Sequence, residues 1–119
     1  MTKHILIIDD DLEILEVIKI VLEEKGYEVT TLSDGNSLTQ KLQLNIPDLI
    51  LLDIWMSGID GPEIAKSLKS DEKTKKIPII MISANNEGAR LAKEVQAEEF
   101  LAKPFDIDDL LNIVNKYLS

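Results

Sequence analysis

The run Leu49-Ile50-Leu51-Leu52, followed directly by Asp53, lies near the middle of the 119-residue chain. Two similar runs, Ile5-Leu6-Ile7-Ile8 and Ile79-Ile80-Met81-Ile82, lie on either side of it in the sequence. All three are short, continuous and apolar, a pattern typical of strands that are buried on both faces of a parallel sheet. The more polar stretches 27–32 and 98–102 fit edge strands better. The sequence therefore predicts five strands, of which three are central.

Amphipathic segments separate the predicted strands. In the stretch 11–25, apolar residues recur at helical spacing at Leu12, Leu15, Ile18 and Leu22, and Gly26 is suited to follow the helix end. Further helices are expected over 36–44, 62–70, 86–94 and 106–118, and the 62–70 segment starts with a proline, which a helix tolerates there. This strict alternation predicts a flavodoxin-like (βα)5 doubly wound α/β sandwich, with a five-stranded parallel sheet in the order 2-1-3-4-5.

Composition excludes several classes of function. The chain has 22 acidic and 13 basic residues, a net charge of -9, no cysteine and a single histidine, His4. Thiolate zinc sites, disulfide scaffolds and multi-histidine metal sites are thereby excluded, and direct binding to nucleic acid or anionic membrane is not expected. Because the chain shows neither a targeting signal nor a linker, we expect a cytoplasmic protein of one domain, residues 1–119, without an output domain and without membrane insertion.

Polar residues collect where the predicted strands end. Ligands of open α/β sheets bind beyond the carboxyl ends of the strands. The residues found there are Asp9, Asp10 and Asp11 after the first strand, Asp53 at the end of the third, Ser83 and Ala84 after the fourth, and Lys103 after the fifth. Clustered carboxylates repel one another unless a cation is present, and a hard cation such as Mg²⁺ suits them best. Because an aspartate can accept a phosphoryl group while a lysine and a hydroxyl hold its oxygens, this set indicates phosphoryl transfer.

Each of these residues has a structural interpretation when it is taken alone. Asp10 with Glu13 resembles a capping box, Asp53 and Ser83 can cap a loop or turn, and Lys103 can be a solvated charge. What favours a site is that the residues fall at equivalent strand ends.

Four sequence blocks together resemble the response-regulator receiver domain of two-component signalling, of the CheY-like superfamily. The blocks are 5–11 (ILIIDDD), 51–61 (LLDIWMSGIDG), 82–84 (ISA) and 100–105 (FLAKPF). Any one block is weakly diagnostic, but four in this order and at this spacing are highly specific, and the resemblance extends over essentially the whole chain.

The resemblance implies a role for each site residue. Asp53 is expected to accept a phosphoryl group from a phosphohistidine on a sensor histidine kinase or a histidine phosphotransfer protein. Mg²⁺, for which Mn²⁺ or Ca²⁺ can substitute in crystals, would be held by Asp10, Asp53 and the backbone carbonyl of Trp55, with Asp9 completing the acidic pocket through water or by facing Lys103. The phosphoryl oxygens would be bound by Ser83, the Ala84 amide and Lys103.

The resemblance also implies a switch and a downstream partner. Ser83 would move toward the phosphoryl group while Phe100 turns inward, and the face built by the fourth helix, fifth strand and fifth helix would carry the signal to a partner protein. The Lys103–Pro104 bond is expected to be cis.

Three positions depart from the family pattern. Ser57 replaces a common proline in the loop after Asp53, Gln96 replaces a common glycine at the end of the fourth helix, and Trp55 is bulkier than most residues at its position. One interpretation of Trp55 is a partly exposed aromatic residue; the other is a lid that slows the access of water to the acyl phosphate.

Two other functions compete with the switch. Asp9-Asp10-Asp11 after an apolar strand also resembles the first motif of haloacid-dehalogenase-type phosphatases, in which Asp9 would be the nucleophile; the early start of the next helix and the short chain weigh against it. An interaction module that is not phosphorylated is the other alternative. An EF-hand is excluded because Ile14 and Ile20 occupy the positions of its glycine and bidentate glutamate.

Overall fold

Strands and helices alternate along the chain in the computed structural model, which describes residues 2–34, 37–56 and 59–119. The strands of the main sheet are β1 (His4–Ile8), β2 (Glu28–Leu32), β3 (Leu49–Asp53), β6 (Ile79–Ser83) and β7 (Glu99–Ala102). The helices are α1 (Leu12–Glu24), α2 (Leu38–Leu44), α3 (Gly61–Ser70), α4 (Gly88–Glu94) and α5 (Ile107–Leu118). Every predicted element is present, and most bounds differ from the prediction by one or two residues.

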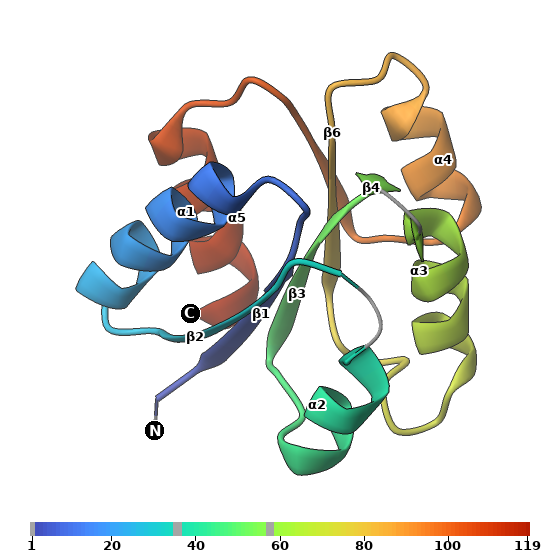
Figure 1. Ribbon diagram of the computed structural model, residues 1–119, viewed down its shortest axis with the longest axis horizontal. Coiled ribbons are helices and arrows are strands. Elements are labelled where there is room, and N and C mark those ends of the chain that lie inside the picture. Colours follow the sequence, from blue (N-terminus) through green and yellow to red (C-terminus); the bar gives the residue numbers. More distant parts are fainter. Residues whose placement is uncertain (1, 35–36, 57–58) are drawn as a thin grey trace.

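The five main strands form one parallel sheet in the order β2-β1-β3-β6-β7. This is the predicted 2-1-3-4-5 arrangement of a flavodoxin-like fold, with the two polar strands at the edges. Figure 1 shows α1 and α5 on one side of the sheet and α2, α3 and α4 on the other. The layers therefore follow the doubly wound plan that the alternation of elements predicts.

The central strands are buried on both faces, as their continuous apolar sequences predict. Alternate side chains point to opposite faces, so Ile5 and Ile7 pack with α1 and α5, whereas Leu6 and Ile8 pack with α2, α3 and α4. All five residues of β1, of β3 and of β6 are buried, including His4, which begins β1. Two apolar cores, one on each side of the sheet, thus hold the strand ends in place.

The helix ends follow local rules. Asp60 accepts a hydrogen bond from the Glu63 N–H and caps α3, while Gly26, with φ +94°, follows the end of α1. Gln96, at φ +63°, takes the same left-handed conformation after α4. Helix α4 ends at Glu94, as predicted. Gln96 thus adopts a conformation that glycine usually favours, and the helix end is unaffected.

One pair of strands was not predicted. After β3 the chain forms the two-residue strands β4 (Trp55–Met56) and β5 (Ile59–Asp60), which pair in antiparallel fashion. Strands this short leave no periodic signal in the sequence. Ser57, one of the positions that depart from the family pattern, lies outside the described residues, as does the side chain of Trp55.

Among the described helices, none has the length and apolar character needed to cross a membrane.

Candidate functional site

Four strands deliver polar side chains to the carboxyl edge of the sheet. Asp53 is the last residue of β3 and Asp9 follows β1, and they are only 4% and 1% exposed. Ser83 ends β6 and pairs in register with Ala102, which is followed by Lys103. Because the strands are parallel and in register, residues that are far apart in sequence meet here, as predicted.

Three carboxylates form a cluster at this edge. Asp9, Asp10 and Asp53 each offer one carboxylate oxygen, and these oxygens all lie within 4.8 Å of one another. Two of the three side chains belong to buried residues, whereas Asp10 is exposed. Carboxylate groups at this spacing repel one another, and hard cations such as Mg²⁺ prefer oxygen ligands. The cluster fits a divalent cation by its donor chemistry and by its excess of negative charge.

Lys103 supplies positive charge next to the cluster. Its Nζ lies 2.9 Å from Oδ2 of Asp9 and 3.5 Å from Oδ2 of Asp53. Burial by itself would lower the pKa of Lys103, but its hydrogen bond to Asp9 and the charges of Asp9 and Asp53 outweigh burial and raise that pKa above its ordinary value. The lysine is therefore a fixed cation that spans two carboxylates of different strands.

The backbone around Lys103 holds it in this position. Its N–H donates to the carbonyl of Ser83 at 2.9 Å, which extends the ladder between β6 and β7 by one bond. The Lys103–Pro104 peptide bond is cis, as expected.

The aspartates that follow β1 have different hydrogen-bond partners. Oδ1 of Asp11 accepts hydrogen bonds from the N–H groups of Glu13 and Ile14 and caps α1. The interpretation of Asp10 and Glu13 as a capping box is therefore wrong, because Asp11 occupies the cap position. Oδ1 of Asp9 accepts from the Asp11 N–H at 2.9 Å, while its Oδ2 faces Lys103. Capping by Asp11 leaves Asp10 and Asp9 to the cluster.

Ser83 lies at the edge but is engaged with its own loop. Its residue is 1% exposed, and its Oγ accepts a hydrogen bond from the Asn85 N–H at 2.9 Å. The turn-capping interpretation of Ser83 is thus correct for this structure. The following residue, Ala84, is exposed. The part that Ser83 and the Ala84 amide take in binding phosphoryl oxygens stays a prediction.

Gly61, to which the sequence analysis assigned no role, lies directly against the phosphoacceptor candidate. A Cβ atom at Gly61 would lie 2.6 Å from the carbonyl oxygen of Asp53 and 2.7 Å from that of Ile54. Both neighbours are backbone atoms, so no side chain can be added without shifting the end of β3. No local sequence pattern indicates this close approach, because it depends on the backbone atoms that pack against residue 61.

Trp55 is described only in part. Its backbone lies in β4, paired with Asp60, two residues after Asp53. Its assignment as a carbonyl ligand and its assignment as a lid both stay predictions.

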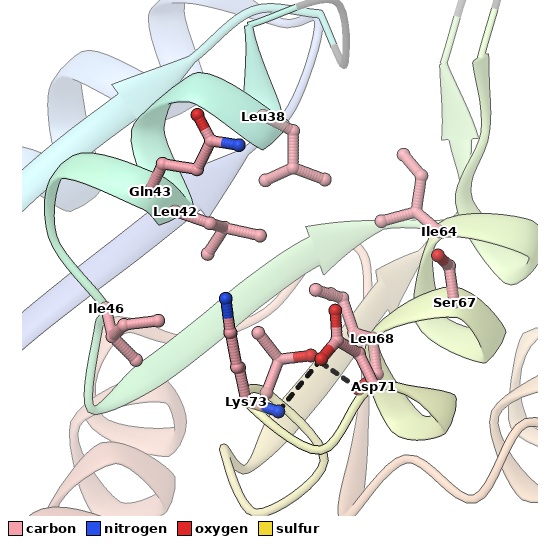
Figure 2. A pocket seen from close by; sticks show the side chains of 10 residues that line it. Leu38, Leu42, Gln43, Ile46, Ile64, Ser67, Leu68, Asp71 and Lys73 are labelled. Carbon is pink, nitrogen blue, oxygen red and sulfur yellow. Dashed lines mark hydrogen bonds between the residues drawn. The ribbon is translucent and has the colours of Figure 1, made fainter.

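A separate groove of about 630 Å³ lies between α2 and α3, away from the acidic cluster (Figure 2). Its walls carry the apolar side chains Leu38, Leu42, Ile46, Ile64 and Leu68. The carboxylate in it, Asp71, accepts a hydrogen bond from the Lys73 N–H and stabilises a turn. This groove therefore lacks the clustered charges that phosphoryl chemistry needs, and the carboxyl edge remains the candidate site.

Sequence comparisons agree with this geometry. Residues 5–115 match the model of the family described as the response regulator receiver domain. The chain is 36% identical over 107 residues to the alkaline phosphatase synthesis transcriptional regulatory protein PhoP of Bacillus subtilis, which covers 88% of this chain and 44% of that protein. It is 40% identical over 111 residues to the phosphate regulon transcriptional regulatory protein PhoB of Pseudomonas aeruginosa, over 92% of this chain and 48% of that protein. The chain thus spans less than half the length of these two relatives.

Solved structures show the same similarity over the full fold. A putative response regulator from Chloroflexus aurantiacus superposes with a TM-score of 0.93 at 32% identity, covering 99% of this chain and 98% of that one. The chemotaxis response regulator CheY4 of Vibrio cholerae superposes with a TM-score of 0.90 at 30% identity, covering 99% and 100%.

Proposed function

The chain belongs to the response regulator receiver domain family, and on that premise we propose that it is a phosphorelay switch whose phosphoacceptor is Asp53. The observation that carries the proposal is the position of Asp53 between a cation and two carboxylates. Its Oδ2 lies 3.5 Å from the Lys103 Nζ, and its residue belongs to the cluster with Asp9 and Asp10. The family is a phosphoacceptor signalling module rather than a classical enzyme.

The proposed reaction transfers a phosphoryl group from histidine to aspartate. A carboxylate oxygen of Asp53 attacks the phosphorus in line with the phosphorus–nitrogen bond of a phosphohistidine. That bond breaks, its electron pair stays on the imidazole nitrogen, which takes up a proton, and Asp53 becomes an acyl phosphate. The donor is a sensor histidine kinase or a histidine phosphotransfer protein.

The residues around Asp53 are suited to this transfer. Asp9, Asp10 and Asp53, with the Trp55 carbonyl, would hold Mg²⁺, which when bound supplies positive charge to the phosphoryl oxygens. Lys103, whose Nζ lies next to Asp53, would neutralise a further phosphoryl oxygen. Burial of Asp53 limits the access of bulk water to the acyl phosphate, and Gly61 keeps the end of β3 where these groups converge.

A groove next to the site supports a protein as the donor. It has a volume of about 480 Å³ and lies between α1 and the segment that follows β7. Its lining includes Ile14 and Val17 of α1, Pro104 and Phe105, and it reaches Lys103 itself. An apolar surface that reaches Lys103, which itself contacts Asp53, can bind the donor protein while the reacting histidine reaches Asp53.

On the output side, the face built by α4, β7 and α5 is proposed to bind an unidentified downstream protein. The two relatives named above are transcriptional regulators more than twice as long as the matched region. We place this chain in the cytoplasm, where a kinase donor would meet it.

The decisive experiment maps the modified residue. The chain is incubated with acetyl phosphate and Mg²⁺, and the acyl phosphate is located by peptide mass spectrometry; we expect it on Asp53, with no modification in Asp53→Asn. Asp11→Asn is the matched control, because Asp11 lies beside the cluster but caps α1, and asparagine caps equally well. It should be modified as the wild type is.

Other outcomes would overturn the proposal. Modification of Asp9 with sustained turnover of phosphate esters would identify a phosphatase instead. No modification on any aspartate, with an intact fold, would identify an interaction module that is not phosphorylated.

A further inference from the structure

Three side-chain positions meet at the start of α4: Gly88, Phe100 of β7 and Ser83 of β6. A Cβ atom built on Gly88 would overlap Cε1 of the Phe100 ring and lie 2.6 Å from its Cζ. The same point is 3.2 Å from the Cβ of Ser83. Carbon atoms that are not bonded normally lie 3.5–4.0 Å apart. The ring can therefore take this position only because residue 88 has no side chain.

The ring lies inward in this structure. Phe100 is partly buried and packs against the apolar core on the side of α2, α3 and α4. Gly88 is itself buried, although the preceding residues 84–87 are exposed. The contact is therefore a packed one, made beneath the loop that joins β6 to α4.

That loop links Gly88 to the hydroxyl of Ser83. The Asn85 N–H donates to Oγ of Ser83 at 2.9 Å, and the Gly88 N–H donates to the carbonyl of Asn85 at 3.0 Å. The loop thus forms a short, hydrogen-bonded unit with Ser83 at one end and the ring of Phe100 against the other. A displacement of the ring acts on the same small space that Ser83 borders.

Gly61 provides the contrast. The atoms that a Cβ at Gly61 would meet are backbone atoms of Asp53 and Ile54, which cannot rotate away. The atoms that a Cβ at Gly88 would meet are at the far end of a flexible side chain. A methyl group at residue 88 is therefore expected to move the ring rather than to break the fold.

We propose that Gly88 is a positioning residue that reserves the space, bordered by Ser83, in which the Phe100 ring lies, and so sets the balance between inward and outward positions of the ring. The inference rests on the proposed function for its link to phosphorylation. With alanine at this position the methyl group takes the space, the ring turns outward from β7, and the packing of the Phe100 ring against residue 88 is lost.

The first test observes the ring directly in the protein without any phosphoryl group. The chain has two phenylalanines, so ¹³C-labelled phenylalanine gives two sets of ring signals, and Phe105→Leu assigns them. In the wild type we expect nuclear Overhauser effects between the Phe100 ring and the α protons of Gly88. In Gly88→Ala the ring signals should shift toward solvent-exposed values and lose contact with residue 88. Unchanged ring contacts in Gly88→Ala would overturn the inference.

The second test measures coupling to the site. Beryllofluoride with Mg²⁺ is titrated while the fluorescence of Trp55, the chain's one tryptophan, is followed. If the inward ring accompanies the phosphorylated state, Gly88→Ala should bind beryllofluoride at least about fivefold more weakly than the wild type, the lower end of typical coupling between sites. In a Phe100→Ala background the same substitution should have no effect, because the ring is absent.

Ala89→Gly is the matched control, since Ala89 is the exposed neighbour in α4 and tests helix propensity alone. It should change neither the ring signals nor the affinity. An equal loss of affinity from Gly88→Ala with and without the ring would show that residue 88 acts through the helix, which overturns the inference. A wild-type chain that does not bind beryllofluoride would overturn the proposed function, whereas the ring displacement, which needs no phosphoryl group, would still decide the steric claim.

Discussion

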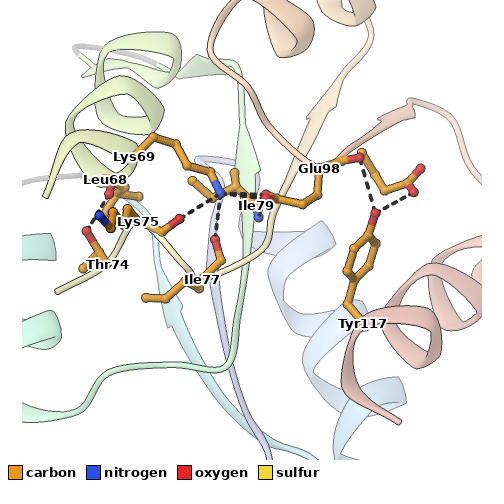
Figure 3. A network of polar contacts seen from close by, with 9 residues as sticks. Leu68, Lys69, Thr74, Lys75, Ile77, Ile79, Glu98 and Tyr117 are labelled. Carbon is orange, nitrogen blue, oxygen red and sulfur yellow. Dashed lines mark hydrogen bonds and ion pairs between the residues drawn. The ribbon is translucent and has the colours of Figure 1, made fainter. Parts of the chain in front are cut away.

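Charged side chains gather at both ends of the strands of the main sheet. The contacts differ between the amino ends of the strands, here called the amino edge, and their carboxyl ends, the carboxyl edge. At the amino edge, Lys69 of α3 donates to both carboxylate oxygens of Glu98 at 2.8 Å and to the carbonyls of Lys75 and Ile77 (Figure 3). Oε1 of Glu98 also accepts from the Ile79 N–H at 2.7 Å. These contacts join α3, the start of β6 and the start of β7.

The same edge continues to α5. Oε2 of Glu99 accepts hydrogen bonds from the Tyr117 hydroxyl at 2.8 Å and from the Lys116 Nζ at 2.6 Å. The network of Lys69, Glu98, Glu99, Lys116 and Tyr117, here called the amino-edge network, thus contains two acids and two lysines. Its charges balance within the protein.

The carboxyl edge gathers its charges differently. In the part of the chain that the structure describes, three carboxylates lie within 4.8 Å of one another, and Lys103 bridges two of them. Repulsion among carboxylates at this spacing costs stability, and functional sites commonly retain such a cost. The comparison indicates that charge at the amino edge joins elements of the fold, whereas charge at the carboxyl edge forms the acidic cluster on which the proposed function rests.

The largest effect is expected from breaking the amino-edge network. Glu98→Ala leaves Lys69, whose side chain is 12% exposed, without its carboxylate and removes the acceptor of the Ile79 N–H. We expect a loss of about 2–4 kcal/mol in the free energy of unfolding, measured by urea denaturation. Glu98→Gln, which keeps an oxygen for the Ile79 N–H, should lose less. A loss below about 0.5 kcal/mol in Glu98→Ala would mean that the network is only a surface ion pair.

At the carboxyl edge, a substitution is expected to raise the free energy of unfolding rather than to lower it. Asp10→Asn removes one of the repelling charges, so without Mg²⁺ the variant should be more stable than the wild type by about 0.5–2 kcal/mol. With Mg²⁺ at about 100 times its Kd, the wild type should gain about 2.7 kcal/mol, which reverses the order because the variant binds the ion weakly. Urea denaturation with and without Mg²⁺ measures both free energies of unfolding. Asp11→Asn is the control, and its stability should stay close to that of the wild type under both conditions. A variant less stable than the wild type in Mg²⁺-free buffer would contradict the comparison.

The smallest expected effect is the contribution of Glu99 to the loss of stability at low pH. Hydrogen bonds from Lys116 and Tyr117 hold the pKa of Glu99 below its ordinary value of 4.5. The contribution of this group to stability is therefore present above about pH 4.5 and is lost as the pH falls through the lower folded-state pKa. Between pH 7 and pH 3 the wild type should lose more stability than Glu99→Gln, by less than about 1 kcal/mol because the pair is partly exposed to solvent. Stability is measured by thermal unfolding at each pH. If both proteins lost the same stability between pH 7 and pH 3, Glu99 would not contribute to the pH dependence of stability.

Much of the fold and the site follows from local patterns in the sequence. Continuous apolar runs predict the three central strands because strands covered on both faces have no polar side. The convergence of Asp9, Asp10, Asp53, Ser83 and Lys103 follows from the parallel order, since carboxyl ends of neighbouring strands meet at one edge. The short strands β4 and β5 were missed because two residues carry no periodicity. The capping box that Asp10 and Glu13 suggest when taken alone was wrong, because the sequence does not show which of three consecutive aspartates caps α1.

The order of the elements and the edge at which the chemistry collects could be predicted from the sequence, because they depend on periodicity and on the ends of strands. The resemblance of four sequence blocks indicated the family. The pairing of charged side chains, in contrast, depends on how the chain packs in three dimensions. Lys69 and Glu98 are 29 positions apart, and Lys103 and Asp9 are 94 apart, so no local pattern links them. The space reserved at Gly61 and Gly88 is likewise invisible in the sequence, because a missing side chain has meaning only through the atoms that pack against it.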